Sequence, residues 1–256
     1  MTAMPVEDVA LETRGLCKSF GALTVANEIS FKLAHGGRHA LIGPNGAGKT
    51  SFVNLVTGAI APSAGQIVLG GVDVTHLSQA QRVKRGLART FQINQLFRGL
   101  SVLENVTLAV GERLGTAGTL LRPAGTRRGV IEEAYELLEQ LGIADEALRL
   151  VRELAYGRQR LVEIAVALGL KPKVLLLDEP AAGVPSGESG TIIDVIEHLP
   201  ADLSLLIIEH DMDLVFRIAR QITVLVQGSI LIEGTPQQIA ADARVREVYL
   251  GERAHS

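Results

Sequence analysis

The chain has 256 residues, of which 47% are hydrophobic and 21% are charged, and its formal net charge is −3. This composition excludes a disordered polyelectrolyte and predicts a globular protein with a large core. The slight excess of acids argues against a global basic field for nucleic acid, and no apolar run approaches the ~18 residues that a membrane helix needs. The one cysteine, Cys17, has no partner for an internal disulfide, which suits a reducing compartment. The first residues carry acids early and do not resemble a secretion signal.

The first third of the chain is typical of strands, because apolar and polar residues alternate in part along it. Strands are predicted at residues 11–20, 28–33, 38–42 and 66–69. A glycine-rich turn follows the third strand and leads into a predicted helix at residues 49–56. Plain turns are expected at Gly70-Gly71 and, much later in the chain, at Gly228.

The middle third is typical of helices. Apolar residues recur at helical spacing over residues 130–141 and again over 161–168, with acids on the opposite face of the first of these segments. The segment 111–129 is rich in Gly, Thr and Arg, and we expect an exposed loop there.

The last third alternates between strands and helices. Two continuous apolar runs, 174–177 and 203–208, predict strands that are buried on both faces of a parallel sheet. Helices are expected at about 190–198 and 214–219, and two short strands at 222–226 and 229–232. This order predicts an α/β sheet into which the helical middle is inserted.

The segment Gly43-Pro44-Asn45-Gly46-Ala47-Gly48-Lys49-Thr50 fits the pattern G-x-x-x-x-G-K-[ST], between a predicted strand and a predicted helix. Glycines in such a loop let successive backbone N–H groups turn toward an anion, and the following helix points its positive end at the same phosphates. Lys49 supplies a charge for the β- and γ-phosphates, and the Thr50 hydroxyl is a ligand for Mg²⁺. The sequence therefore predicts a phosphate-binding loop.

An acidic pair, Asp178 and Glu179, follows the predicted strand at 174–177. The carboxyl end of a central strand is where an open α/β sheet binds its ligand. Asp178 is therefore a candidate partner of Mg²⁺, directly or through a water molecule, and Glu179 is a candidate general base for the attacking water. Alone, the pair would fit an acidic helix start equally well, but the upstream phosphate loop favours the catalytic role.

Together these residues resemble the nucleotide-binding subunits of ABC transporters, and the resemblance covers residues 11–252. Such proteins carry a signature of the Leu-Ser-Gly-Gly-Gln type before the acidic pair, and the segment that begins at Leu154 occupies that place. Gln92 matches the glutamine-loop residue, His210 the switch histidine and Phe20 the aromatic residue that stacks on adenine. Singly, Gln92 and His210 would also fit surface residues, and Phe20 a core residue. The resemblance rests on the order and spacing of all the elements.

The resemblance implies an α/β fold of the P-loop NTPase (ABC ATPase) type, with a RecA-like core, an antiparallel β subdomain and an inserted α-helical signature subdomain. One domain is expected over residues 9–252, with its core at about 9–92 and 172–235, the helical subdomain at about 93–171 and a C-terminal extension at about 236–256. ATP and Mg²⁺ are the implied ligands. The implied catalytic residues are Glu179, His210, Lys49 and Gln92, and the implied metal-binding residues are Thr50, Gln92 and Asp178. The implied nucleotide contacts are Phe20, Gly43, Pro44, Asn45, Gly46, Ala47, Gly48, Lys49, Thr50, Ser51, Ala155, Tyr156 and Gly157.

Finer features are similar to the ATPases of branched-chain amino acid importers, namely Arg89-Thr90-Phe91-Gln92, the run 178–183 and the ending 245–252. Lipopolysaccharide-export ATPases share the ending but usually lack the Arg-Thr-Phe, so the importer is favoured. Importers of urea or short amides look much the same. The alternatives are such an export ATPase, or a soluble or catalytically weakened ABC ATPase with a regulatory role.

The resemblance also implies partners. A second ABC ATPase subunit, identical or different, would pair head to tail with this one, so that ATP lies between the phosphate loop of one and the signature of the other. Transmembrane permease subunits and, indirectly, a solute-binding protein complete the assembly, at the cytoplasmic face of the cell membrane. No nucleic-acid partner is expected.

The sequence departs from the family pattern at two places, the signature and the loop after Gly183. The signature serine is Ala155, which has no hydroxyl to donate to a γ-phosphate, and Arg158 replaces the usual glutamine. Arg158 either brings charge to the phosphates or is a solvated helix-start residue. The loop after Gly183 reads Val-Pro-Ser in place of an Asn-Pro pair. In the signature itself, Gly157 is expected to let the backbone approach a phosphate.

A basic cluster stands between Asp73 and Glu104 with no intervening acid. It comprises Arg82, Lys84, Arg85, Arg89 and Arg98. We interpret it as a solvated face in preference to a surface near the membrane partner or lipid head groups.

Overall fold

The computed structural model describes residues 9–90, 96–116 and 124–253. The chain forms two compact units. The first unit consists of Met1–Leu87, Lys173–Glu179 and Pro200–Ser256, and the second of Ala88–Pro172 and Pro180–Leu199. The segment Pro180–Leu199 thus groups with the helical residues, whereas the predicted helical subdomain at about 93–171 did not include it. Within the described ranges, no helix combines the length and the apolar character needed to cross a membrane.

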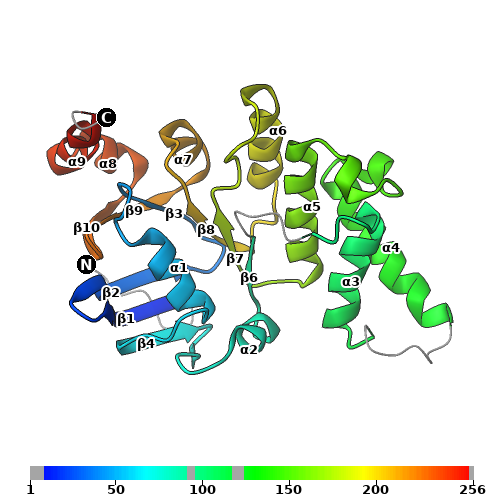
Figure 1. Cartoon of the computed structure of the whole chain (residues 1–256), viewed down its shortest axis with the longest axis horizontal. Helices are drawn as coiled ribbons and strands as arrows, with labels where there is room; N and C mark the ends of the chain where they lie inside the picture. The colour runs from blue at the N-terminus through cyan, green and yellow to red at the C-terminus, as the bar shows by residue number, and fades with distance from the viewer. Residues whose placement is uncertain (1–8, 91–95, 117–123, 254–256) are drawn as a thin grey trace. The chain divides into compact units, whose positions relative to one another are not determined.

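An antiparallel sheet opens the first unit (Figure 1). Its order is β2 (Leu23–Ala34), β1 (Val9–Phe20), β4 (Ala64–Leu69) and β5 (Val72–Asp73). Gly70 and Gly71 make the tight turn between β4 and β5, with φ angles of 53° and 79°. A Cβ atom on either glycine would meet no atom within 4 Å, so this turn is plain, as predicted.

A second sheet carries the core of the first unit. Its order is β10 (Ser229–Gly234), β9 (Gln221–Val226), β3 (Arg38–Ile42), β8 (Ser204–Ile208), β7 (Val174–Asp178) and β6 (Leu87–Arg89). β3 pairs in parallel with β8 and with β9, and β8 pairs in parallel with β7. Every residue of β7 and β8 is buried, which confirms the two predicted buried strands.

Helix α1 (Lys49–Thr57) joins the two sheets into one apolar core. Phe52 of α1 packs edge-on against Phe31 of β2, with ring centroids 5.5 Å apart. The same core cluster includes Leu176 and Leu206 of the parallel sheet. A separate cluster packs α7 (Met212–Ile218), α8 (Pro236–Ala241) and α9 (Ala243–Arg253) against β3 and β9. The helix that begins at the phosphate loop therefore packs in the core that the two sheets share.

Arg82 corrects the interpretation of the basic cluster as a solvated face. It lies on α2 (Gln79–Lys84), whose start is fixed by a capping box between Ser78 and Gln81, and only 1% of its surface is exposed. Its guanidinium donates to the carbonyl oxygens of Leu55 and Val56, at 2.7 and 2.6 Å, in the last turn of α1. It also donates to the carbonyl oxygens of Thr75 and Leu77. Burial lowers its pKa. Arg82 is thus a structural cap for the carboxyl end of α1, while Lys84 and Arg85 are exposed.

The second unit is mainly helical, with α3 (Val102–Arg113), α4 (Ala124–Gln140), α5 (Tyr156–Gly169) and α6 (Ser186–Glu197). Helices α3, α4 and α5 lie side by side (Figure 1). The predicted exposed loop at 111–129 is wrong at both ends, because α3 continues to Arg113 and α4 begins at Ala124. A contact of Arg113 explains the first of these differences. A capping box of Ser101 and Glu104 starts α3, and Arg113 in its last turn pairs with Glu133 of α4 at 2.6 Å.

Candidate functional site

The predicted phosphate loop lies between β3 and α1, in the first unit. Gly46 and Gly48 adopt left-handed conformations, with φ angles of 76° and 101°. A Cβ atom on Gly48 would lie 2.6 Å from the Val25 carbonyl oxygen, and one on Gly43 would collide with the carbonyl oxygen of Leu225. Only glycine fits these positions, so the loop backbone is held in a shape that side chains would prevent.

The amino end of α1 and Lys49 supply positive charge at this loop. Gly48 is the N-cap and has no side chain to cap α1, so the helix begins without a side-chain cap. The Lys49 ammonium folds back to donate to the carbonyl oxygens of Gly43 and Pro44, the latter at 3.0 Å. Asn45, Gly46 and Thr50 are exposed, and Ser51 is half-buried. A helix amino end, a lysine and an open glycine loop match the needs of a phosphate group.

The turn at Gly228 braces the phosphate loop, which corrects its prediction as a plain turn. Gln227 and Gly228 form the left-handed turn between β9 and β10, with φ angles of 47° and 77°. The Gly228 N–H donates to the Ala47 carbonyl oxygen at 2.8 Å, and its own carbonyl oxygen accepts from the Asn27 N–H, also at 2.8 Å. The turn therefore connects β2 to the loop that would hold phosphate.

Phe20 ends β1 at the tip of the β1–β2 hairpin, and 54% of its surface is exposed. The Lys18 ammonium lies 4.9 Å from the centroid of its ring. Phe20 is therefore not a core residue, and an exposed aromatic face is available for stacking.

The carboxyl ends of β7 and β8 bring Glu179 and His210 together, although they are far apart in the chain. Asp178 is the last residue of β7 and is buried. Glu179 follows it in a left-handed conformation, φ 47°, with its N–H donating to the Ile208 carbonyl oxygen at 2.9 Å. Its Oε1 lies 3.7 Å from Nδ1 of His210, whose side chain is mostly exposed. A non-glycine residue in this backbone region is strained, and such strain is concentrated at functional sites.

In the second unit, the predicted signature segment forms the start of α5. Ala155 is the exposed N-cap and makes no side-chain cap. The Tyr156 hydroxyl accepts from Arg160 at 2.8 Å, and Arg160 in turn pairs with buried Glu163, whose pKa is raised by burial. The amide groups at this helix start therefore have no hydroxyl beside them, unlike those of α2 and α3.

The sequence profile of the ABC transporter family matches residues 26–182. The chain belongs to this family. A second profile, described as branched-chain amino acid ATP-binding cassette transporter, matches residues 230–255.

Individual relatives agree with this membership. BraF of Pseudomonas aeruginosa, a high-affinity branched-chain amino acid transport ATP-binding protein, is 39% identical over 94% of this chain and 98% of its own length. LivG of Escherichia coli carries the same description and shows the same identity and coverage. Among solved structures, the ADP conformation of MJ1267, an ATP-binding cassette of an ABC transporter, has a TM-score of 0.82 and 30% identity, over 95% of this chain and 99% of that one. The predicted P-loop NTPase fold of the ABC ATPase type is thereby confirmed.

Two of the three predicted metal-binding residues of this ABC protein lie among the described residues. Thr50 is the second residue of α1, Asp178 ends β7, and both belong to the first unit. Among the described residues, no group of three or more His, Cys, Asp or Glu side chains is arranged to hold a metal. Mg²⁺ commonly takes one or two protein ligands and completes its shell with phosphates and water. Gln92, the third predicted ligand and a predicted catalytic residue, lies outside the described residues.

Gly157 and Arg158 make local contacts within the second unit. A Cβ atom on Gly157 would lie 2.5 Å from Oε2, the movable end of the Glu188 side chain in the first turn of α6, and 3.3 Å from a methyl group of Val184, so this glycine lies close against neighbouring side chains. Arg158 donates to the Gly142 carbonyl oxygen at 3.1 Å and lies 3.9 Å from Glu146. This contact favours a structural role for Arg158 at the start of α5. Gly183 lies against the Tyr156 ring, at 3.4 Å from an added Cβ.

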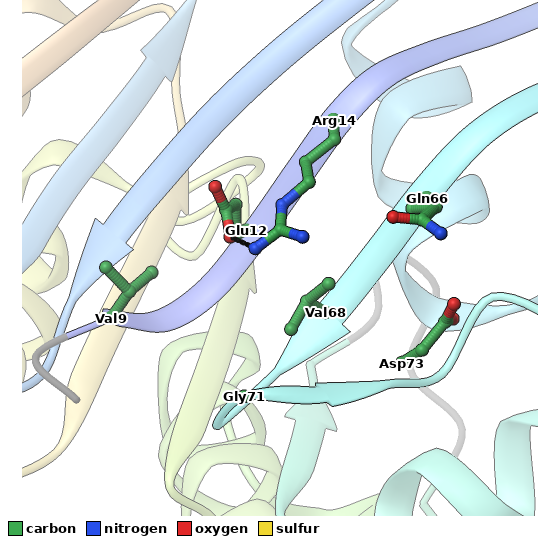
Figure 2. A pocket seen from close by; sticks show the side chains of 7 residues that line it. All are labelled: Val9, Glu12, Arg14, Gln66, Val68, Gly71 and Asp73. Atoms are coloured by element: carbon green, nitrogen blue, oxygen red, sulfur yellow. Dashed lines mark hydrogen bonds and ion pairs between the residues drawn. The ribbon is translucent and has the colours of Figure 1, made fainter. Parts of the chain in front are cut away.

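A pocket on the antiparallel sheet contains none of the predicted site residues (Figure 2). Val9, Glu12, Arg14, Gln66, Val68, Gly71 and Asp73 line it. Arg14 pairs with Glu12 at 2.6 Å, and this hydrogen bond lowers the pKa of Glu12.

Proposed function

We propose that this chain is the ATP-binding and ATP-hydrolysing subunit of an importer for branched-chain amino acids or related small polar or amide solutes. The observation that carries the proposal is the hydrolytic geometry of the first unit. A glycine loop and Lys49 stand at the start of α1, and Glu179 and His210 meet at the carboxyl ends of β7 and β8. The substrate class comes from the relatives BraF and LivG, and from the C-terminal match.

ATP is the proposed substrate. The phosphate loop from Gly43 to Ser51 would bind its phosphates through backbone N–H groups, and Phe20 would stack on adenine. Thr50 and Asp178, with Gln92, would hold Mg²⁺, which when bound neutralises charge on the phosphates. The positions of Gly43, Gly46 and Gly48 in strained or crowded backbone support this assignment.

Hydrolysis would use Glu179 as the general base for water and His210 as the contact to the γ-phosphate. A base must lie within hydrogen-bond reach of the water that it activates, and the left-handed turn at Glu179 directs its carboxylate toward His210. Lys49 and the backbone N–H groups would stabilise charge as the γ-phosphate leaves. Most of the rate enhancement would then come from positioning and electrostatics.

The proposed partners follow from the family. A second ABC ATPase subunit would supply the signature for the ATP bound here, and Ala155, Tyr156 and Gly157 of this chain would meet the ATP of that subunit. Permease subunits would hold the assembly at the cytoplasmic face of the cell membrane, and a solute-binding protein would deliver the solute. The chain would act as one domain over residues 9–252, with the predicted core, helical subdomain and C-terminal extension.

The decisive experiment replaces Glu179 with Gln in the transporter assembled with its permease subunits. This substitution keeps the size of the side chain but removes the base, so we expect ATP hydrolysis and solute uptake into proteoliposomes to fall by about 10²-fold or more while ATP still binds. Glu139→Gln, at an exposed position of α4, is the matched control and should leave both rates unchanged. Hydrolysis at the normal rate in Glu179→Gln would refute the assignment of the base. Active hydrolysis without uptake of any branched-chain amino acid or of any related small polar or amide solute would refute the substrate class.

A further inference from the structure

Glu209 is a buried carboxylate that none of the proposed roles uses. It stands between the end of β8 at Ile208 and His210, and only 2% of its surface is exposed. Burying a carboxylate is costly unless hydrogen bonds or opposite charges compensate for the lost water. Its position next to the switch histidine therefore calls for a reason beyond packing.

The carboxylate clamps the backbone that carries His210. One oxygen, Oε2, accepts from the His210 N–H at 3.0 Å and from the Asp211 N–H at 3.3 Å. Asp211 is in turn the N-cap of α7, and its Oδ1 accepts from the Asp213 N–H at 2.9 Å. The segment between β8 and α7 is thus held by two carboxylates in succession, and His210 lies within the first clamp.

The same oxygen faces the imidazole ring. Nδ1 of His210 lies 3.8 Å from Oε2 of Glu209 and 3.7 Å from Oε1 of Glu179. Two carboxylates on one edge favour a proton on Nδ1, because each is an acceptor only. That arrangement leaves the opposite edge, with Nε2, as the one available to another ligand.

We propose that Glu209 is a positioning residue for ATP hydrolysis, which orients the switch histidine by clamping its backbone and by facing Nδ1, the ring atom that Glu179 also faces. The inference rests on the proposed function, since it assumes that His210 contacts the γ-phosphate. Glu209 itself touches neither nucleotide nor water in this role.

Two substitutions separate the clamp from the charge. Glu209→Gln keeps an oxygen that accepts from both N–H groups but removes the charge, whereas Glu209→Ala removes both. In the assembled transporter, we expect kcat to fall about threefold in Glu209→Gln and about tenfold or more in Glu209→Ala, with KM for ATP changed less than about twofold because the phosphate loop is intact. In the full-length chain, ¹⁵N chemical shifts of the His210 ring, assigned by their loss in His210→Ala, should show less proton on Nδ1 in Glu209→Gln.

The outcomes distinguish the two proposals. Normal kcat and an unchanged His210 ring signal in Glu209→Gln, with hydrolysis abolished in His210→Ala, would overturn the role of Glu209 alone. Normal hydrolysis in His210→Ala would overturn the role of the histidine, and with it the proposed mechanism. If Glu209→Ala does not fold, Glu209→Gln and its ring signal decide. A fall in kcat that comes with an equal rise in KM for ATP would indicate general damage to the site and would also count against the inference.

Discussion

One helix start in each unit, that of α1 in the first and that of α5 in the second, is held by different contacts. In the first unit, α1 follows a glycine loop, and Gly228 donates a hydrogen bond to Ala47 of that loop. Arg82 binds carbonyl oxygens at the opposite, carboxyl end of the helix. In the second unit, α5 begins at Ala155, likewise without a side-chain cap, and the Glu188 side chain lies against Gly157. Each helix start is proposed to face a phosphate, and the one in the first unit follows a loop that a backbone hydrogen bond from Gly228 braces.

The difference indicates that the residues for the nucleotide of this chain and the residues for the nucleotide of the partner can change independently of each other. Apart from Gln92, which lies outside the described residues, the residues proposed to bind and hydrolyse the nucleotide of this chain lie in the first unit, and those proposed to serve the partner's nucleotide lie in the second. A weakened signature would then leave the ATP on this phosphate loop unaffected when the partner subunit supplies a complete one. The following predictions test whether the first unit depends on its braces and whether the second has lost a donor.

The largest effect is expected at Arg82. Arg82→Met removes a buried cation and leaves the carbonyl oxygens of Leu55 and Val56 without their donor, so we expect the free energy of unfolding to fall by about 2–4 kcal/mol. Urea unfolding of the purified chain measures this. Arg85→Met, three residues on and exposed, is the control and should cost less than about 0.5 kcal/mol. Equal effects would show that Arg82 does not cap α1.

His39 predicts a loss of stability in acid. It lies on β3, which leads into the phosphate loop, its Nε2 is 2.8 Å from the Thr223 hydroxyl, and burial lowers its pKa to about 4. An unfolded histidine binds its proton near its ordinary pKa of about 6.5. The unfolded state therefore holds more protons between these values, and stability should fall as pH drops from about 6.5 to about 4. Urea midpoints across this range should shift less in His39→Gln; the same acid dependence in that variant would exclude His39 as the cause.

We expect a substitution of Gly228 to change the affinity for the nucleotide. Gly228→Ala combines a left-handed φ with a Cβ placed 2.9 Å from the Val25 carbonyl carbon, so we expect a cost of about 1–3 kcal/mol and a raised KM for ATP. Gly71→Ala has nearly the same φ, 79°, but open space around the added atom. It therefore shares the backbone penalty and should leave KM unchanged. A raised KM in both variants would mean that backbone strain, and not the brace on Ala47, is responsible.

The smallest effect is expected from a substitution of Ala155. Ala155→Ser adds an N-cap for α5, worth about 1 kcal/mol of stability, and restores a hydroxyl that can donate to a phosphate. In the assembled transporter we expect ATP turnover to rise by up to about tenfold if the signature of this chain limits hydrolysis at the partner's site. Thermal unfolding separates the cap from the donor. A more stable chain with unchanged turnover and ATP affinity would show that the missing hydroxyl has no catalytic consequence.

Several parts of this protein followed from the sequence alone. The phosphate loop, the acidic pair and the two buried strands were predicted because a complete motif and a continuous apolar run are local patterns. Such patterns depend on neighbours in the chain, whose spacing can be read directly. The membership of the ABC transporter family rested on the same local motifs and on their order.

Other features were decided only by tertiary contacts. Arginine is usually exposed, so nothing in the spacing of the basic cluster distinguished Arg82 from Arg85, and only its fit among the carbonyl oxygens of α1 buries it. Likewise, Gly228 looked like any turn glycine until the fold placed Ala47 against it. The meeting of Glu179, Glu209 and His210 arises because parallel strands end at one edge of the sheet. The sequence alone thus determined which residues have the chemistry for phosphate, and the fold determined which of them are braced, buried and brought together, because long-range packing leaves no local pattern.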